Sequence, residues 1–381
     1  MTADISFCFS TTNRILFGPG TVHDLGNETA GLGGKRILLV TGKRALRTSG
    51  HLTKIESCLH NAGLAVFPFS EVPPEPTLSV VERGIGILQA ERCDAVVAVG
   101  GGSALDVGKA IAALASAPGS VHEYFYGREL ERKGYPFVAV PTTAGTGAEV
   151  TSNSVLTDEI QGLKTSIRSR YMLPDVAIVD PELLLTAPPS VTASSGMDAL
   201  CQAVEAFVSN GANPLTDTLA KDAAVRLLKY LPTAFEKGSD ITARTETALG
   251  SLMGGIAFAN ARLGLAHGMA HPLGIVTGLP HGVICALLLP LVIRFNIPVV
   301  AEKYSILAQA SGLEDASALA DEIDRLNQVM QISDNIPKLR PPRDTWQKII
   351  TQTLASGSAK SNPRPVSKAD VESILRSLSD L

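Results

Sequence analysis

Runs of aliphatic residues alternate with helix-length segments through the first half of the chain. Five runs rich in Val, Ile and Leu predict strands. They occupy residues 35–40, 64–69, 94–103, 135–143 and 174–181, and the third ends in a glycine loop that opens a helix. Continuous apolar runs separated by helices are typical of a parallel sheet with helices on both faces. Ligands are then expected at the carboxyl ends of the strands.

The pattern changes after about residue 188. Strand-like runs disappear, and Ala/Leu-rich helical periodicity follows, for example at 197–209, 219–235 and 320–332. Pro188–Pro189 breaks the chain before these helices, and Pro341–Pro342 separates a C-terminal segment. Because 381 residues exceed one comfortable core, we expect two domains. They are a Rossmann-like α/β domain at 1–188 and an all-helical domain at 189–381, with the active site between them.

Composition narrows the class of protein. Apolar residues make up 45% of the chain and charged residues 18%, with a net charge of -4, which argues against disorder. No basic stripe indicates nucleic acid, and no Lys/Arg block indicates a membrane surface. The five cysteines are widely spaced without a CxxC motif, and the N-terminus lacks the pattern of a signal peptide. Reduced thiols and a cytoplasmic protein are expected.

Three of the seven histidines fall in a window, residues 263–293, that holds no Asp, Glu, Lys or Arg. They are His267, His271 and His281. The window is long enough to raise the question of a membrane span, but its prolines and glycines favour a buried core that lines a site. Imidazoles in an apolar wall are typical of a metal or proton-transfer site.

Two loops of small residues follow successive strands. Gly100, Gly101, Gly102 and Ser103 precede a helix, where backbone N–H groups can face a pyrophosphate. The loop is neither GxGxxG nor a Walker loop, so a tight turn without a ligand is an equal alternative. The second loop, 141–151, offers hydroxyls that suit a ribose or an amide. They belong to Thr142, Thr143, Thr146 and Thr151.

Asp198 and Gln202 lie at positions i and i+4 of a predicted helix, on one face. Alone, such residues usually cap a helix or face solvent. Together with the H-x3-H-x9-H spacing of the histidine window, they indicate a metal site.

The ordered motifs resemble the iron-containing (group III) alcohol dehydrogenase family, which has a dehydroquinate-synthase-like fold. They are FGPG at 17–20, PEPT at 74–77, GGGSALDVGK at 100–109, PTTAGTGAEVT at 141–151, PDVAIVDP at 174–181, GMDAL at 196–200, HGMAHPLG at 267–274, PHG at 280–282 and NPRPV at 362–366. The resemblance implies a divalent metal, usually iron and sometimes zinc, bound by an Asp and three His. Three positions carry over as Asp198, His267 and His281. The fourth is Gln202, where the family has His.

The resemblance also implies nucleotide contacts and assembly. Asp106, Lys164 and Leu183 match family positions assigned to the cofactor site, and homodimers are common in the family. His271, one helical turn after His267, is placed near the nicotinamide, for proton relay or substrate contact. A buried histidine with satisfied hydrogen bonds is an equal alternative.

Gln202 leaves three alternatives for the metal. Gln and His are both neutral and of similar reach, but an amide oxygen is a weaker donor than imidazole to a first-row metal. The site is then a weakened iron or zinc site, a site occupied only with substrate, or a site without metal.

The end of the first strand bears on the cofactor. NAD-using relatives tend to carry Asp after the V-T pair, where it accepts from ribose hydroxyls and repels a 2′-phosphate. This chain has Gly42 there, followed by Lys43, Arg44 and Arg47. The pattern favours NADP, with NAD as the alternative. Lys43 and Arg44 can equally be ordinary solvated charges.

The combined hypothesis is an NAD(P)-dependent, metal-assisted alcohol dehydrogenase or aldehyde reductase for a small or medium alcohol or aldehyde, with Phe258 and Leu263 lining the pocket. Three alternatives remain. The first is a maleylacetate-reductase-like oxidoreductase. The second is a dehydroquinate-synthase-like lyase, which the uncharged window disfavours. The third is an inactive, metal-free relative, because of Gln202.

Overall fold

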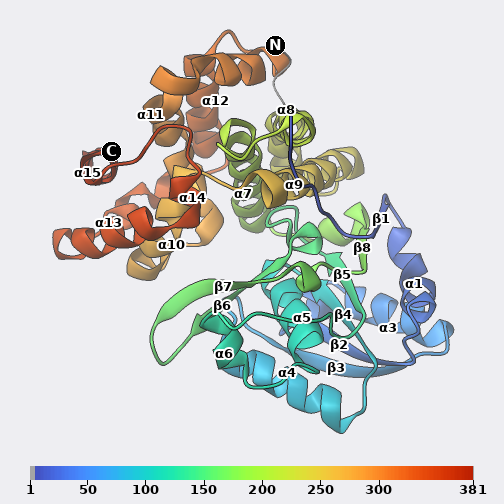
Figure 1. The fold of residues 1–381 in the computed structure, drawn as a ribbon. Coiled ribbons are helices and arrows are strands. Elements are labelled where there is room, and N and C mark those ends of the chain that lie inside the picture. Colours follow the sequence, from blue (N-terminus) through green and yellow to red (C-terminus); the bar gives the residue numbers. More distant parts are fainter. Residues whose placement is uncertain (1–4, 381) are drawn as a thin grey trace. The chain divides into compact units, whose positions relative to one another are not determined.

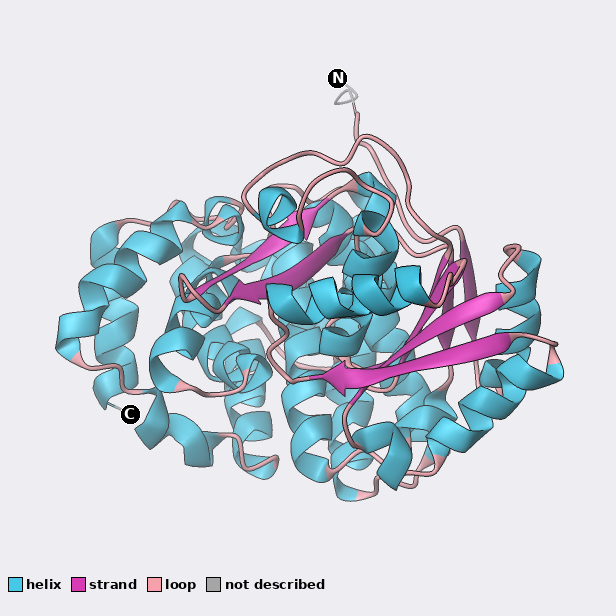
Figure 2. Cartoon of the chain, turned by 90° about the horizontal axis from the view of Figure 1, so that it is seen from below, coloured by secondary structure: helices cyan, strands magenta, loops and turns pink. Residues whose placement is uncertain are grey.

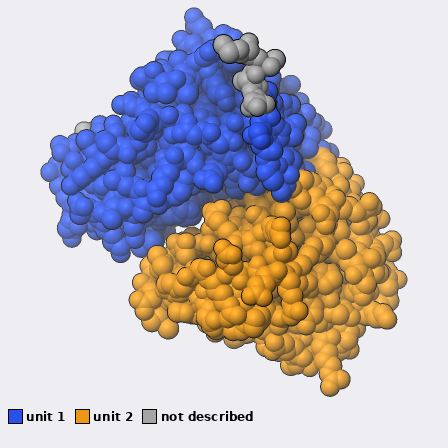
Figure 3. All heavy atoms as spheres, in the orientation of Figure 1, with its two compact units in different colours: residues 1–10, 188–381 blue, residues 11–187 orange. Residues whose placement is uncertain are grey.

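The computed structural model describes residues 5–380, which divide into two compact units. Residues 11–187 form the first, here called the α/β unit. Residues 188–381 and the segment up to Ser10 form the second, here called the helical unit (Figure 3). In the helical unit, Ser10 N donates to Asn260 Oδ1 at 2.8 Å. The sequence had assigned this N-terminal segment to the α/β domain.

The α/β unit is built on one six-stranded sheet in the order β1-β8-β5-β4-β2-β3 (Figure 1). All neighbouring strands are parallel. The strands are β1 (Arg14–Phe17), β2 (Arg36–Gly42), β3 (Ala65–Val72), β4 (Ala95–Gly100), β5 (Phe137–Pro141) and β8 (Val176–Val179). The principal helices are α1 (Leu25–Gly31), α3 (His51–Asn61), α4 (Leu78–Ala90), α5 (Gly102–Leu114) and α6 (Val121–Phe125).

Both faces of the sheet are buried, which explains the continuous apolar runs. Leu38 and Val40 of β2 belong to the core shared with α4 and α5, whereas Ile37 and Leu39 point to the opposite face and are equally buried. On the first face the helix approaches the sheet closely: a Cβ at Gly108 of α5 would lie 2.5 Å from Ala98 Cβ. The predicted parallel α/β architecture is confirmed.

The sequence did not predict two features of this unit. β1 is a four-residue edge strand whose pattern is too short to stand out. β6 (Asn153–Asp158) and β7 (Leu163–Arg168) form a separate antiparallel hairpin. Its side chains alternate between buried and more exposed positions, so it lacks the aliphatic run that marked the other strands.

The helical unit contains no strand among the described residues; the strands drawn in magenta in Figure 2 belong to the α/β unit. Its helices are α7 (Pro189–Val208), α8 (Pro214–Glu236), α9 (Ile241–Ala261), α10 (Leu265–Thr277), α11 (His281–Ala310), α12 (Ala316–Val329), α13 (Trp346–Ala355), α14 (Gly357–Lys360) and α15 (Lys368–Asp380). Proline occupies the first turn of α7 and α8, and Asn213 caps α8 by accepting from two backbone N–H groups.

One described helix, α11, is apolar and long enough to span a membrane by length and composition alone. Of its most apolar window, 61% is buried, and the helix packs against α7, α10 and α12. These contacts are those of a central core helix, in line with the sequence interpretation of this window.

A buried lysine ties α5 to the β6 edge of the α/β unit. Lys109 Nζ donates to the backbone oxygens of Ala148, Thr151 and Asn153 at 2.8–2.9 Å. Burial lowers the pKa of Lys109 to about 8, and burial raises that of nearby Asp106 to about 6. The ammonium therefore acts as a structural donor to three carbonyls.

We expect Lys109→Met to lower the free energy of unfolding by about 3 kcal/mol, because three buried carbonyls lose their donor. Urea denaturation of the full chain measures the change. Lys54→Met, which removes a partly exposed pair with Glu182, is the matched control and should cost about 0.5 kcal/mol. A loss below about 1 kcal/mol for Lys109→Met would contradict the structural role.

Candidate metal and nucleotide sites

Three helices of the helical unit bring one carboxylate and two imidazoles together. Asp198 comes from α7, His267 from α10 and His281 from α11. Asp198 Oδ1 lies 3.4 Å from His267 Nε2 and 3.7 Å from His281 Nε2. These three residues are here called the metal cluster. The structure therefore places side by side the three residues that the sequence grouped.

Glu205 fixes the orientation of His267. Its Oε2 lies 2.7 Å from His267 Nδ1, so this nitrogen carries a proton and Nε2 is turned toward Asp198. The same carboxylate accepts from Gly264 N at 2.9 Å and Ala266 N at 2.6 Å. Glu205 thus also satisfies the N-terminus of α10, where a negative charge is favourable.

Three buried atoms at the cluster have no hydrogen-bond partner within the described residues. They are Asp198 Oδ1, His267 Nε2 and Gln202 Oε1. Buried polar atoms without a partner are costly. A divalent cation is a group that Asp198 Oδ1 and His267 Nε2 could both bind, so the residues present fit a metal.

The charges around the cluster also favour a cation. Burial alone would lower the pKa of His267, because it disfavours the imidazolium form. The neighbouring anionic groups have the larger combined effect and raise the pKa of His267 well above its usual value. Burial likewise disfavours the thiolate of Cys285, but a hydrogen bond with Cys201 and the adjacent imidazoles lower its pKa well below the usual value. Metal binding replaces protons on such groups.

The other two predicted residues lie beside the cluster. Gln202 Nε2 donates to Asp198 Oδ2 at 3.1 Å. The ring of His271 stacks on that of His281, with centroids 4.9 Å apart. His271 is partly exposed, unlike His267.

In the α/β unit, the two predicted phosphate and hydroxyl loops lie against each other. Thr142 N donates to Gly100 O at 2.9 Å. A Cβ at Gly102 would lie 2.7 Å from Thr146 Oγ1, and one at Gly101 would lie 3.5 Å from Thr143 Oγ1. No side chain caps the N-terminus of α5, which begins at Gly102. Glycine is required here because the second loop occupies the space of a side chain.

The strand order places these loops at a switch point. From β2 the chain crosses to β3 on one side, and from β4 it crosses to β5 on the other, while β2 and β4 are neighbours. In open α/β sheets the crevice at such a point is the usual ligand site. Gly42 ends β2 and Gly100 ends β4, so both lie at this edge.

Residues 12–181 match the iron-containing alcohol dehydrogenase family, and residues 192–379 match the C-terminal domain of Fe-containing alcohol dehydrogenases. The chain belongs to the iron-containing alcohol dehydrogenase family. The sequence prediction of this family and of an NAD(P)-dependent alcohol dehydrogenase is confirmed. The enzyme is an oxidoreductase.

Relatives match over nearly the whole chain. The 1,3-propanediol dehydrogenase of Klebsiella pneumoniae is 38% identical over 380 residues, covering 97% of this chain and 98% of its own. The NAD-dependent methanol dehydrogenase of Bacillus methanolicus is 34% identical, covering 95% and 97%. A crystal structure of 1,3-propanediol oxidoreductase superimposes with a TM-score of 0.93 at 37% identity, covering 98% and 100%.

Several predicted cofactor residues of this alcohol dehydrogenase have other partners in the structure. Ser103 Oγ donates to Pro74 O, and Lys164 Nζ pairs with Glu75, each at 2.5 Å. Thr151 Oγ1 lies 3.2 Å from the buried Lys109 Nζ. Nucleotide contacts at these positions stay predictions.

Two further predicted cofactor positions are buried. Asp106 accepts from Val155 N at 3.1 Å and so helps to hold the hairpin. Leu183 is buried in the short helix Pro181–Leu184 after β8. Here too a nucleotide contact stays a prediction.

Sequence reasoning missed Glu205 and Cys285, although spacing offered a signal for both. Glu205 follows Asp198 at i+7 and Gln202 at i+3, on the same face of α7. Cys285 follows His281 at i+4 on α11, and its Sγ lies 3.5 Å from His281 Nε2. The signal for Cys285 is a possible metal ligand four residues after a histidine on the same predicted helix.

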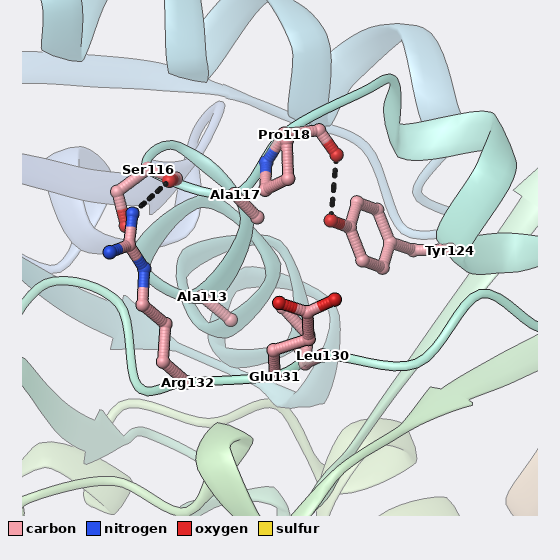
Figure 4. Close-up of a pocket in the computed structure, with 8 residues that line it drawn as sticks. All are labelled: Ala113, Ser116, Ala117, Pro118, Tyr124, Leu130, Glu131 and Arg132. Atoms are coloured by element: carbon pink, nitrogen blue, oxygen red, sulfur yellow. Dashed lines mark hydrogen bonds between the residues drawn. The ribbon is translucent and has the colours of Figure 1, made fainter.

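A small pocket elsewhere in the α/β unit is shown in Figure 4. Tyr124 closes one side by donating to Pro118 O, and Arg132 donates to Ser116 O on the other. None of the predicted site residues lines this pocket, so it is separate from the predicted metal and nucleotide sites.

Proposed function

We propose that this enzyme interconverts short primary alcohols and aldehydes with a divalent metal held by Asp198, His267 and His281. One observation carries the proposal: Asp198 Oδ1 and His267 Nε2 are buried and lie 3.4 Å apart, and neither atom has a hydrogen-bond partner among the described residues. A bound divalent cation supplies a Lewis acid, and a bound nicotinamide supplies a hydride donor or acceptor.

The remaining groups of the site position these donors and move protons. Glu205 keeps the His267 proton on Nδ1, which leaves Nε2 free to bind a cation. The amide of Gln202 holds Asp198 by its Oδ2. His271 stacks on His281 and is partly exposed, which suits transfer of a proton between the site and solvent.

In the α/β unit, Gly100–Ser103 and the N-terminus of α5 receive the pyrophosphate, and Thr142, Thr143 and Thr146 lie beside it. Lys43 and Arg44 are exposed after β2 and have no acidic partner within residues 5–380. Their charges favour a 2′-phosphate, so we propose NADP over NAD.

The substrate proposal rests on the uncharged histidine window and on the relatives. Leu263, the first residue of this window, and Phe258, five residues before it, are both half-buried. The relatives named for 1,3-propanediol and methanol act on small alcohols. A short, uncharged alcohol or aldehyde fits these features. Homodimer assembly and a cytoplasmic location stay predictions.

We expect activity to depend on added metal. The protein is stripped with EDTA, divided, and reloaded with Fe(II), with Zn(II) or with neither, and NADPH and NADH oxidation is followed with propanal. The stripped portion should lose nearly all activity. Asp198→Asn should lose metal and activity together, whereas the surface change Asp222→Asn should lose neither. Equal rates in all three portions would favour the metal-free alternative.

We expect Glu205→Gln to weaken metal binding about 10- to 100-fold, because a neutral amide with one accepting oxygen replaces the carboxylate that orients and polarises the His267 Nδ1–H group. Competition with a chromophoric chelator measures the affinity. Glu246→Gln, a partly exposed partner of Arg226, should leave it unchanged. Wild-type affinity in Glu205→Gln would show that the charge of Glu205 does not support the metal site.

We expect Gly42→Asp to shift the preference from NADPH to NADH by about tenfold in kcat/KM, which is about 1.4 kcal/mol. A carboxylate there repels a 2′-phosphate and accepts from ribose hydroxyls. The side chain fits, since a Cβ at Gly42 would meet only Val72 O, at 3.9 Å. Gly42→Asn tests the charge alone and should shift the ratio much less. A wild-type preference for NADH would contradict the NADP proposal.

A further inference from the structure

The amide of Gln202 does not take the place of the family histidine directly. Its Nε2 donates to Asp198 Oδ2 at 3.1 Å. A carboxylate only accepts hydrogen bonds, so the amide must keep its nitrogen toward Asp198, and an amide N–H group offers no lone pair to a metal. The side of Gln202 that faces the metal cluster is therefore a hydrogen-bond donor.

A thiol lies beside the cluster instead. Cys285 is on α11 one turn after His281, and its side chain is fully buried. Its Sγ, the two imidazole nitrogens and the Asp198 oxygen all lie within 4.8 Å of one another. Cys285 Sγ is 3.5 Å from His281 Nε2, the same nitrogen that lies 3.7 Å from Asp198 Oδ1. The sulfur and the carboxylate thus converge on one point.

Three of the six separations match the edges of a tetrahedron. Bonds of about 2.0–2.3 Å from a metal to nitrogen, oxygen and sulfur give ligand-to-ligand distances of about 3.3–3.8 Å. The distances Asp198–His267, Asp198–His281 and His281–Cys285 are 3.4, 3.7 and 3.5 Å. The other three pairs lie within 4.8 Å, so the four side chains can approach one ion.

We propose that Cys285, as a thiolate, is the fourth protein ligand of the metal in this chain. This inference rests on the proposed function, in which Asp198, His267 and His281 bind that metal. On binding, the S–H bond breaks, the proton leaves to solvent and a sulfur–metal bond forms, without oxidation or reduction. A soft sulfur donor shifts the preference of the site toward Zn(II) or Co(II) and away from Fe(II).

Cys201 is a neighbour of this ligand set and provides the matched control. Its Sγ lies 3.7 Å from His267 Nδ1, the ring nitrogen opposite to the one that faces Asp198. Both thiols are buried, but only Cys285 belongs to the group of side chains around Asp198, whereas Cys201 groups with Glu205 and His267. Cys201 therefore lies outside the cluster, and a serine at position 201 retains a donor.

The test titrates the EDTA-stripped full-length protein with Co(II) and records the absorption spectrum. Visible d–d bands report that Co(II) is bound, and a near-ultraviolet thiolate-to-cobalt band reports sulfur ligation. Wild type and Cys201→Ser should show both bands. Cys285→Ser should lose the near-ultraviolet band and bind Zn(II) at least about 100-fold more weakly, since loss even of an outer hydrogen-bond partner costs about 10- to 100-fold.

The outcomes separate this inference from the proposed function. Absence of all Co(II) bands in wild type would overturn the metal site itself. Visible bands without the near-ultraviolet band in wild type would keep the metal site and overturn thiolate ligation. Loss of the near-ultraviolet band in Cys201→Ser, with retention in Cys285→Ser, would assign the ligand to Cys201 and overturn the proposal.

Two further measurements test the ligand, and the first uses only the wild type and so does not depend on the folding of Cys285→Ser. X-ray absorption of Zn(II)-loaded wild type should show one sulfur at about 2.3 Å among nitrogen and oxygen at about 2.0–2.2 Å; a shell without sulfur would overturn the proposal. Gln202→His in the Cys285→Ser background should restore Zn(II) affinity without sulfur, because it supplies an imidazole. Unchanged Zn(II) affinity in Cys285→Ser alone would count against it.

Discussion

The Glu205 carboxylate is the interaction on which the metal cluster depends. It lies in the last turn of α7 and accepts from two backbone N–H groups at the start of α10 and from Nδ1 of His267. One group therefore fixes where α10 begins, which direction the His267 ring faces and which of its nitrogens is free. Its negative charge is buried at a helix N-terminus, where it is compensated. Without this carboxylate, the His267 ring would lose the contact that turns its Nε2 toward Asp198.

A buried charged group also supports the α/β unit, but there it is the positive ammonium of Lys109. Lys109 donates from the interior of α5 to three carbonyls around the second loop and the hairpin. This contact explains why the predicted nucleotide residues divide into two groups. Gly100–Gly102, Thr143 and Thr146 border the space between the loops, whereas the Thr151 hydroxyl lies against Lys109. Residues of one motif thus divide into those that border the first loop and one, Thr151, that contacts the buried Lys109.

The sequence predicts the elements and residues that a local pattern marks. It predicts fewer of the residues whose role depends on partners far away in the chain. The parallel sheet could be predicted because strands buried on both faces are aliphatic throughout, and the histidines because their window has no charge. The hairpin and β1 escaped because neither has such a run. Glu205 escaped for another reason: its partners are about 60 residues away, so its role exists only after α7 and α10 pack together.

The proposed thiolate has a consequence for the charge of the whole site. Asp198, a Cys285 thiolate and a dication sum to zero, and the buried Glu205 carboxylate beside His267 then makes the site negative. One carboxylate with three neutral imidazoles would be neutral once Glu205 is counted. The two backbone N–H groups at the start of α10 that donate to Glu205 compensate a buried negative charge at this place. A thiolate from position 285 in place of an imidazole at position 202 would therefore make the site softer and more anionic, and burial of that charge would depend on those donors.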